Sequence, residues 1–112
     1  WTATAGPVLY YTVSAASPGG SLVYRFSGPG ISSTADNPTL YLYKGFTYIF
    51  KNNATSHPFA IRTNANGSGF FEGISGSQTG TQTFIVPHSI SDTSLVYQCT
   101  IHSGMVGNLT IV

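Results

Sequence analysis

The only cysteine and the only methionine of the chain lie in one short run, C-x-x-H-x-x-M, formed by Cys99, His102 and Met105. A thiolate, an imidazole and a thioether are soft donors of the kind that bind copper. Each side chain alone has an ordinary explanation, as a small buried residue, a surface residue or a core filler. Because all three fall within seven positions, metal binding is the favoured interpretation.

The run is predicted to be a tight loop between two strands. Gly104 and Gly107, with β-branched residues on both flanks, argue against a helix. A loop alone cannot enclose an ion, so a further ligand must come from a neighbouring strand, and His57 stands at the start of one. The complete set matches a trigonal copper site of two histidines and one cysteine with a weak axial methionine: His57, Cys99, His102 and Met105.

Zinc is the competing metal, since it accepts the same cysteine and histidine ligands. Structural zinc sites are tetrahedral and rarely recruit methionine, so one copper ion per chain is the preferred prediction. The ligand histidines must be neutral and the cysteine must be a thiolate. Binding is therefore expected to release protons and to weaken in acid.

The elements that must position these ligands are predicted to be strands. The chain has 112 residues, which suits a single domain over 1–112, and 13% of them are aromatic. Only 6% are charged and the net charge is +1, which excludes the basic surface that nucleic acid requires. No apolar run is long enough for a membrane span.

Strand patterns recur between turn signals and predict an antiparallel β-sandwich or barrel of seven to eight strands. A hairpin is predicted for 40–43 and 46–50 around Gly45, with Lys51 pointing outward. The longest loop covers 63–80, with Phe70, Phe71 and Ile74 as its expected anchors. The predicted strands cover 8–13, 22–27, 40–43, 46–50, 57–62, 81–86, 95–99 and 108–112.

The N-terminal part, 1–30, is predicted to be an extra hairpin or an addition at a sheet edge. The chain begins at Trp1 without an initiator methionine or a signal peptide. We therefore expect it to be processed, or to be part of a larger polypeptide.

Over roughly 38–112 the chain resembles the cupredoxins, the type 1 blue copper family. The matching residues are Gly45-x-x-Tyr48-x-Phe50-x-Asn52, then His57, then Tyr97-x-Cys99-x-x-His102-x-x-Met105-x-Gly107. The short ligand loop is similar to that of amicyanin-like members, one of the tightest in the family. The phrases Ser56-His57-Pro58-Phe59 and His102-Ser103-Gly104-Met105 are also similar to cupredoxin-like domains of marine bacterial and phage structural proteins. The resemblance implies a Greek-key β-sandwich, one type 1 copper with Met105 axial, and one-electron transfer.

Two positions depart from the family pattern, and with Asn52 they are the predicted supporting residues of the site. Pro58 stands where many members have an asparagine whose backbone N–H bonds the ligand sulfur, and proline has no N–H. Ile101 stands where amicyanin-like and plastocyanin-like members carry proline. We therefore hypothesise that the Ile101 N–H donates to the Cys99 sulfur and tunes the redox potential.

The resemblance also implies that a redox partner docks on an uncharged patch around His102. Residues 93–112 carry no formal charge, although burial of the strands explains this equally well. The first functional hypothesis is an extracytoplasmic electron carrier. The second is a structural or adhesion module of a larger secreted or virion protein, with structural or absent copper. The third is metal sequestration. An enzyme is not expected, because copper oxidases need further clustered histidines such as H-x-H pairs.

Overall fold

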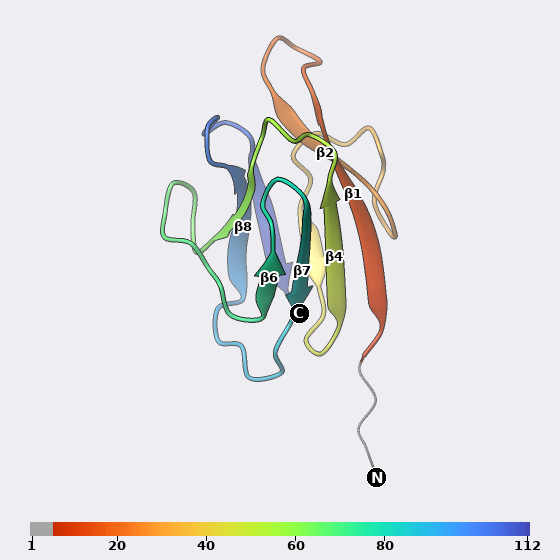
Figure 1. Ribbon diagram of the computed structural model, residues 1–112, viewed down its shortest axis with the longest axis vertical. Helices are drawn as coiled ribbons and strands as arrows, with labels where there is room; N and C mark the ends of the chain where they lie inside the picture. The colour runs from red at the N-terminus through yellow and green to blue at the C-terminus, as the bar shows by residue number, and fades with distance from the viewer. Residues whose placement is uncertain (1–5) are drawn as a thin grey trace.

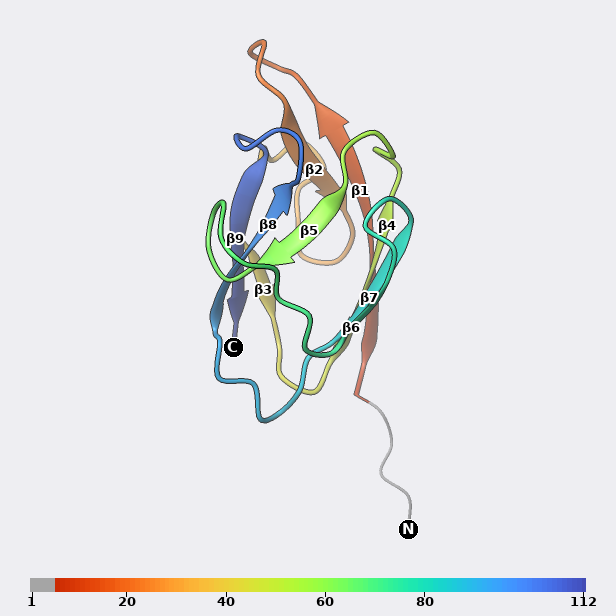
Figure 2. The same cartoon turned by 60° about the vertical axis from the view of Figure 1, so that its left-hand side comes forward.

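The computed structural model describes residues 6–112, which form two β-sheets packed face to face (Figures 1 and 2). The five-stranded sheet has the order β2-β1-β4-β7-β6, and the four-stranded sheet has the order β3-β9-β8-β5. The predicted all-β sandwich is confirmed. Its strands are β1 (Val8–Ala16), β2 (Val23–Ser27), β3 (Leu40–Leu42), β4 (Thr47–Asn52), β5 (Phe59–Arg62), β6 (Ile74–Gly76), β7 (Thr81–Ile85), β8 (Ser94–Cys99) and β9 (Val106–Ile111).

Alternating burial along the strands builds the core between the sheets. In β4, Tyr48 and Phe50 are buried while Lys51 is exposed, as the period of two predicts. Aromatic rings fill the centre, where Phe26 and Tyr97 meet edge to face with their ring centroids 4.9 Å apart. The core is therefore large enough to fix the relative position of the two sheets.

Both sheets are mixed, whereas the sequence pattern predicted antiparallel pairing throughout. Strands β1 and β4 pair in parallel, and so do β3 and β9. Parallel pairs need long crossover connections, and here these connections pass from one sheet to the other. The alternation of residues is the same in both kinds of pair, so it could not distinguish them.

The predicted hairpin of 40–43 and 46–50 is wrong, because β3 and β4 belong to different sheets. The turn itself was correctly placed. Gly45 has a φ of 84°, and its N–H donates to the carbonyl of Val86 at 2.8 Å. The turn thus carries the chain from one layer of the sandwich to the other instead of folding it back within one sheet.

The N-terminal segment does form the predicted hairpin, and β1 joins it to the five-stranded sheet through β4. Residues 1–5, including Trp1, lie outside the described part. The core is not confined to 38–112, since Tyr11, Val13, Tyr24 and Phe26 are all buried in it. The hairpin is consequently part of the sandwich and not an appendage.

The long loop 63–80 contains a strand that its glycine- and serine-rich sequence did not predict. Strand β6 pairs with β7, which brings the number of strands in residues 6–112 to nine. Phe70 is buried and Ile74 packs against the core, as expected for anchors, but Phe71 is exposed. Within the same described residues, no helix is long and apolar enough to cross a membrane.

Candidate metal centre

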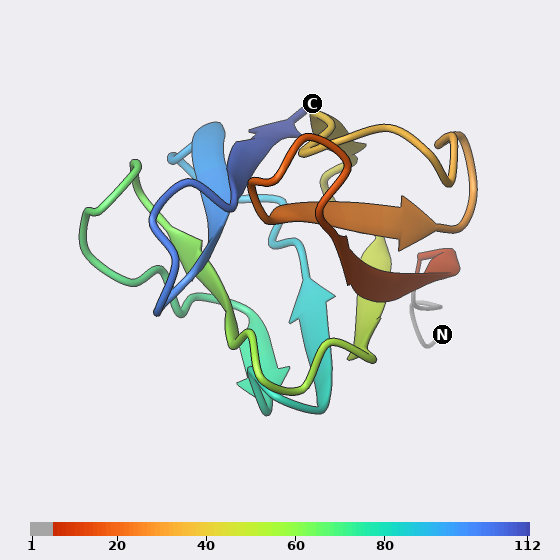
Figure 3. The same ribbon diagram turned by 90° about the horizontal axis from the view of Figure 1, so that it is seen from above.

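Three of the four predicted ligands converge at one end of the sandwich. Seen from above (Figure 3), the 99–105 loop lies beside the segment that leads into β5. The Nδ1 atoms of His57 and His102 are 3.2 Å apart, and they lie 3.8 Å and 3.7 Å from the Cys99 sulfur. The structure therefore brings His57 next to Cys99, which lies 42 positions further along the chain.

The triangle of donor atoms has the size of a metal coordination plane. The point equidistant from its three corners lies about 2.1 Å from each, which is close to the length of metal–imidazole and metal–thiolate bonds. Cys99 is only 1% exposed, while both histidines are half-buried. One thiolate and two imidazoles in a water-poor setting fit a copper ion with a trigonal ligand set.

The 99–105 loop is closed by its own backbone. The Cys99 N–H donates to the Met105 carbonyl at 2.9 Å, and the Met105 N–H donates to the His102 carbonyl at 3.0 Å. These two bonds fold the run back between β8 and β9, as the glycines predicted. The fold of the loop therefore brings the side chains of Cys99 and His102 together.

Met105 is fully buried at the end of this loop, with 0% of its surface exposed. Its backbone holds the loop, and its burial next to β9 suits either an axial ligand or a core side chain. The structure brings together His57, Cys99 and His102, and the role of the Met105 thioether stays a prediction.

His57 is held by its backbone carbonyl. This oxygen accepts hydrogen bonds from the Tyr24 hydroxyl at 2.8 Å and from the Asn52 side-chain amide at 2.9 Å. The His57 N–H donates to the Ala54 carbonyl at 2.8 Å. Asn52 was predicted as a supporting residue. Tyr24 was not predicted, because nothing in the sequence around it indicates that β2 contacts the distant His57.

Burial raises the pKa of the Tyr24 hydroxyl far above its ordinary value, and the Cys99 side chain raises it further. The hydroxyl therefore stays protonated and remains a hydrogen-bond donor at every ordinary pH. It also donates to the Pro58 carbonyl at 3.1 Å. Pro58 thus contributes an acceptor to the site in place of the N–H that it lacks.

A fully buried glutamine, Gln98, holds the other side of the site. Its amide nitrogen donates to the Ser103 carbonyl at 2.9 Å and to the Asn66 side-chain oxygen at 3.1 Å. Its amide oxygen accepts from the Asn66 N–H and from the Arg62 guanidinium, both at 2.8 Å. The side chain uses both donors and both acceptor positions, so it ties the ligand loop to the 63–69 turn.

Asn37 links the same loop to the connection between β2 and β3. Its amide donates to the Gly104 carbonyl at 3.3 Å, and its side-chain oxygen accepts from the Tyr24 N–H at 2.9 Å. Its φ is 44°, a left-handed conformation that asparagine tolerates better than most residues. Sequence reasoning missed both Gln98 and Asn37.

The predicted bond from the Ile101 N–H to the Cys99 sulfur is not among the hydrogen bonds of the described residues, so it stays a prediction. The Ile101 side chain is 65% exposed beside His102. The third histidine, His88, lies in a turn against Gly45 and does not join the site.

A comparison with known protein families and with curated protein sequences found no match. Among solved structures, the chain is similar to rusticyanin from Thiobacillus ferrooxidans, with 18% identity and a TM-score of 0.53. That similarity covers 96% of this chain and 79% of the other. A histidine-to-methionine variant of rusticyanin gives 17% identity and a TM-score of 0.51, covering 97% and 80%. The likeness therefore extends over both sheets.

Proposed function

The chain has the cupredoxin fold, and from this premise we propose that it is a mononuclear type 1 copper protein that transfers one electron at a time. The observation that carries the proposal is the triangle formed by the Cys99 sulfur and the two Nδ1 atoms of His57 and His102. Its size and its donor types suit one copper ion, and Met105 is the proposed axial ligand.

Copper supplies a one-electron couple when it is bound, and the protein's contribution is to hold the donor atoms still. His57 is fixed through its carbonyl by two donors, and the loop is fixed by its own backbone and by Gln98. A site that is rigid before the electron arrives needs little rearrangement afterwards. The buried thiolate is shielded from water, while the half-buried His102 provides the way in and out for the electron.

Loading the purified chain with Cu(II) tests the proposal. We expect one copper per chain and an intense visible band from charge transfer between the Cys99 thiolate and copper. The matched control is Cys99→Ser, which preserves the size of the side chain but should abolish the band. A loaded wild-type protein without such a band would exclude the type 1 site.

We also propose that the Ile101 N–H donates to the ligand sulfur once copper is bound, since Pro58 cannot. Ile101→Pro removes this donor, so the sulfur should become more electron-rich and the reduction potential should fall. The measurement is a redox titration of the copper-loaded variant, with Ile101→Ala as a control that retains the N–H. An unchanged potential in Ile101→Pro would argue against the bond.

The proposal has three further parts. A redox partner docks on an uncharged surface of this chain around His102, the protein is extracytoplasmic, and the domain alone does not catalyse a reaction. Ile101 is exposed beside His102, and 93–112 contain no charged residue. The alternative is a structural module of a larger protein. A chain that binds zinc and copper equally well and has no reversible redox couple would favour that alternative or metal sequestration.

A further inference from the structure

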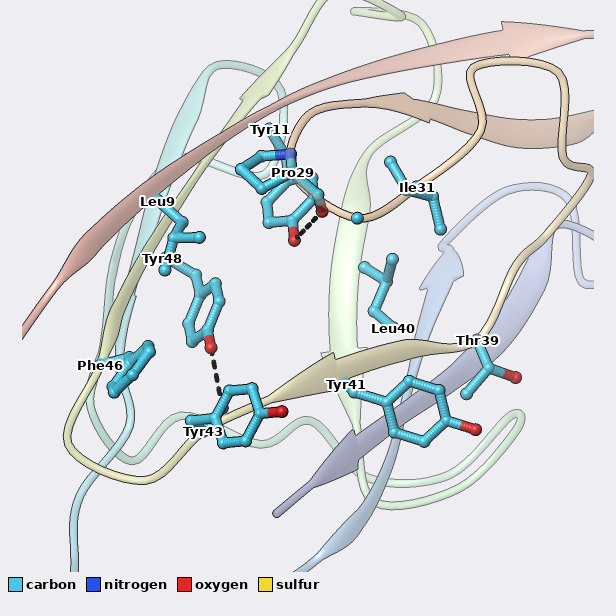
Figure 4. A pocket seen from close by; sticks show the side chains of 11 residues that line it. Leu9, Tyr11, Pro29, Ile31, Thr39, Leu40, Tyr41, Tyr43, Phe46 and Tyr48 are labelled. Carbon is cyan, nitrogen blue, oxygen red and sulfur yellow. Dashed lines mark hydrogen bonds between the residues drawn. The ribbon is translucent and has the colours of Figure 1, made fainter.

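A cavity of about 270 Å³ opens on the side of the sandwich, away from the metal centre (Figure 4). Tyr43 and Phe46 border it at the β3–β4 turn, and Figure 1 shows this turn at the opposite end from the 99–105 loop. The cavity exists because β2 pairs with β1 only along Thr12–Ala16. At Leu9, the side of β1 that faces away from β4 has no strand partner among residues 6–112. The space between the two sheets is open there.

One wall of the cavity is formed by the segment that follows β2, and contacts with Tyr11 hold this segment in place. A side chain at Gly28 would come within 2.5 Å of the Tyr11 ring, so only glycine lets the backbone lie against that ring. The Tyr11 hydroxyl then donates to the Pro29 carbonyl at 2.8 Å. The cavity is therefore bounded by a loop that is anchored to the core, and its shape does not depend on a free loop.

The lining is aromatic and carries no formal charge. Tyr11, Tyr48 and Leu40 are buried and form the floor, whereas Tyr41 and Tyr43 are exposed at the rim. No Lys, Arg, His, Asp or Glu is among the residues that border the cavity. A charged ligand would lose its hydration there without gaining a partner, so the lining selects a neutral molecule with a flat apolar body.

Two hydroxyl groups of the floor retain unused hydrogen-bonding capacity. The Tyr48 hydroxyl oxygen accepts from the Tyr43 N–H at 2.8 Å, and its own hydrogen has no acceptor among residues 6–112. The Tyr11 hydroxyl donates to Pro29, so its oxygen can still accept. Figure 4 shows the Tyr48 hydroxyl directed toward the Tyr43 backbone and the Tyr11 hydroxyl directed toward the Pro29 carbonyl, both at the border of the cavity. The floor thus offers a ligand one unused donor, at Tyr48, and one unused acceptor, at Tyr11.

We propose that this cavity is a binding site for a small neutral molecule of the phenol class, with one flat ring and one hydroxyl group. The ring lies among the tyrosines, and the ligand hydroxyl accepts a hydrogen bond from the Tyr48 hydroxyl. The cavity volume is near the lower limit for ligand pockets, which suits a ligand of one or two rings. This site is independent of the metal centre and of the function proposed above.

Calorimetric titration of the purified full-length chain with p-cresol tests the proposal. We expect one saturable site per chain, and we expect toluene, which has the same ring without the hydroxyl, to bind about three- to tenfold more weakly. In Tyr48→Phe the difference between the two probes should shrink. Lack of saturable p-cresol binding would overturn the site, and equal binding of p-cresol and toluene to the wild type would overturn the role of the hydroxyl groups.

Two further variants locate the site and guard against misfolding, because Tyr48→Phe also removes the acceptor of the Tyr43 N–H. Ile31→Trp places a large side chain at a partly buried position that borders the cavity, and it should abolish p-cresol binding. Tyr10→Phe alters an exposed tyrosine of β1 that does not border the cavity. This variant should bind p-cresol as the wild type does. Unchanged binding in Ile31→Trp would place the probe elsewhere and refute the proposal.

Discussion

The two sides of the metal centre are supported in different ways. His57 is held by side chains of the five-stranded sheet, Tyr24 from β2 and Asn52 from β4, and both bind one carbonyl oxygen. The 99–105 loop is held from within the four-stranded sheet by Gln98, which distributes four hydrogen bonds over three residues. One side therefore has two donors on a single atom, while the other relies mainly on Gln98, with one longer bond from Asn37 to Gly104.

This difference predicts that the site is robust to substitutions near His57 and sensitive to substitutions near the loop. His57 leads into β5 of the four-stranded sheet but is held by residues of the five-stranded sheet, so the dimensions of the donor triangle depend on how the two sheets pack. Substitutions on each side can be compared directly through two measurements, the free energy of unfolding and the affinity for copper.

The largest effect is expected for Gln98→Leu. This variant leaves the Ser103 carbonyl, the Asn66 N–H and the Arg62 guanidinium without their partner, and should lower the free energy of unfolding by about 2–4 kcal/mol. Copper affinity should fall roughly 10- to 100-fold because the ligand loop loses its anchor. Urea unfolding and competition with a chelator measure the two quantities.

The matched control is Gln82→Leu, which alters another buried glutamine. Gln82 lies on β7 and donates to the Phe59 carbonyl at 2.8 Å. Gln82→Leu should lower the free energy of unfolding while changing copper affinity less than Gln98→Leu does. If both variants lose copper affinity equally, the loop is not specifically dependent on Gln98.

A smaller effect is expected for Asn52→Ala on the other side of the site. The His57 carbonyl keeps the Tyr24 hydroxyl as a donor, and the Gln78 carbonyl keeps the Phe59 N–H, although the Ala54 N–H loses its acceptor. We expect a loss of about 1–3 kcal/mol in stability and a smaller fall in copper affinity than for Gln98→Leu. Asn53→Ala, at the exposed neighbouring position, should change neither quantity, and a reversed order of the two affinities would contradict the comparison.

Two substitutions of Asn37 separate what its side-chain hydrogen bonds and its left-handed backbone conformation each contribute to stability. Asn37→Gly loses the bonds to Gly104 and Tyr24 but accommodates a φ of 44°, and should cost about 0.5–1.5 kcal/mol. Asn37→Ala should be less stable than Asn37→Gly by up to about 1 kcal/mol, because alanine is strained in that conformation. Thermal unfolding of both variants decides the order, and alanine as the more stable replacement would refute the argument.

The smallest effect concerns pH. Burial raises the pKa values of Tyr11, Tyr24, Tyr48 and Tyr97 above the ordinary value of 10.0. The unfolded chain therefore loses these protons first as the pH rises above 10, and the stability that is complete below that pH decreases. Tyr97→Phe removes one such group, so its unfolding free energy should fall less steeply between pH 9 and pH 11. An equal slope would mean that Tyr97 does not contribute.

The three donors that the structure brings together could be predicted because two of them, Cys99 and His102, lie in one short run of the sequence with Met105. Only His57 had to be found elsewhere, and the Met105 thioether remains a predicted ligand. The strands were equally visible, since alternation of apolar and polar residues depends only on neighbouring positions. The exposed Phe71 shows the limit of this reasoning, because an aromatic residue next to a buried one need not be buried.

Long-range pairing could not be predicted in the same way. Alternation does not reveal which strands become neighbours, so the partners of β3 and β4 were assigned wrongly. The supporting residues Tyr24 and Gln98 were missed for the same reason. Their side chains are ordinary for strands, and they acquire their role only through the carbonyl oxygens that the fold brings to them.

Sequence separation has a further consequence for the order of events during folding. The bond from Asn37 to Gly104 joins residues 67 positions apart, and the bond from Tyr97 to Pro38 joins residues 59 positions apart. Closing such distances costs chain entropy before any contact compensates for it, and this slows folding. The donor triangle needs β5, β8 and β9 for its ligands and β2 and β4 for the support of His57, so we expect it to be completed only after the two sheets have packed. The blue colour expected of the copper form would then report the packing of the two sheets.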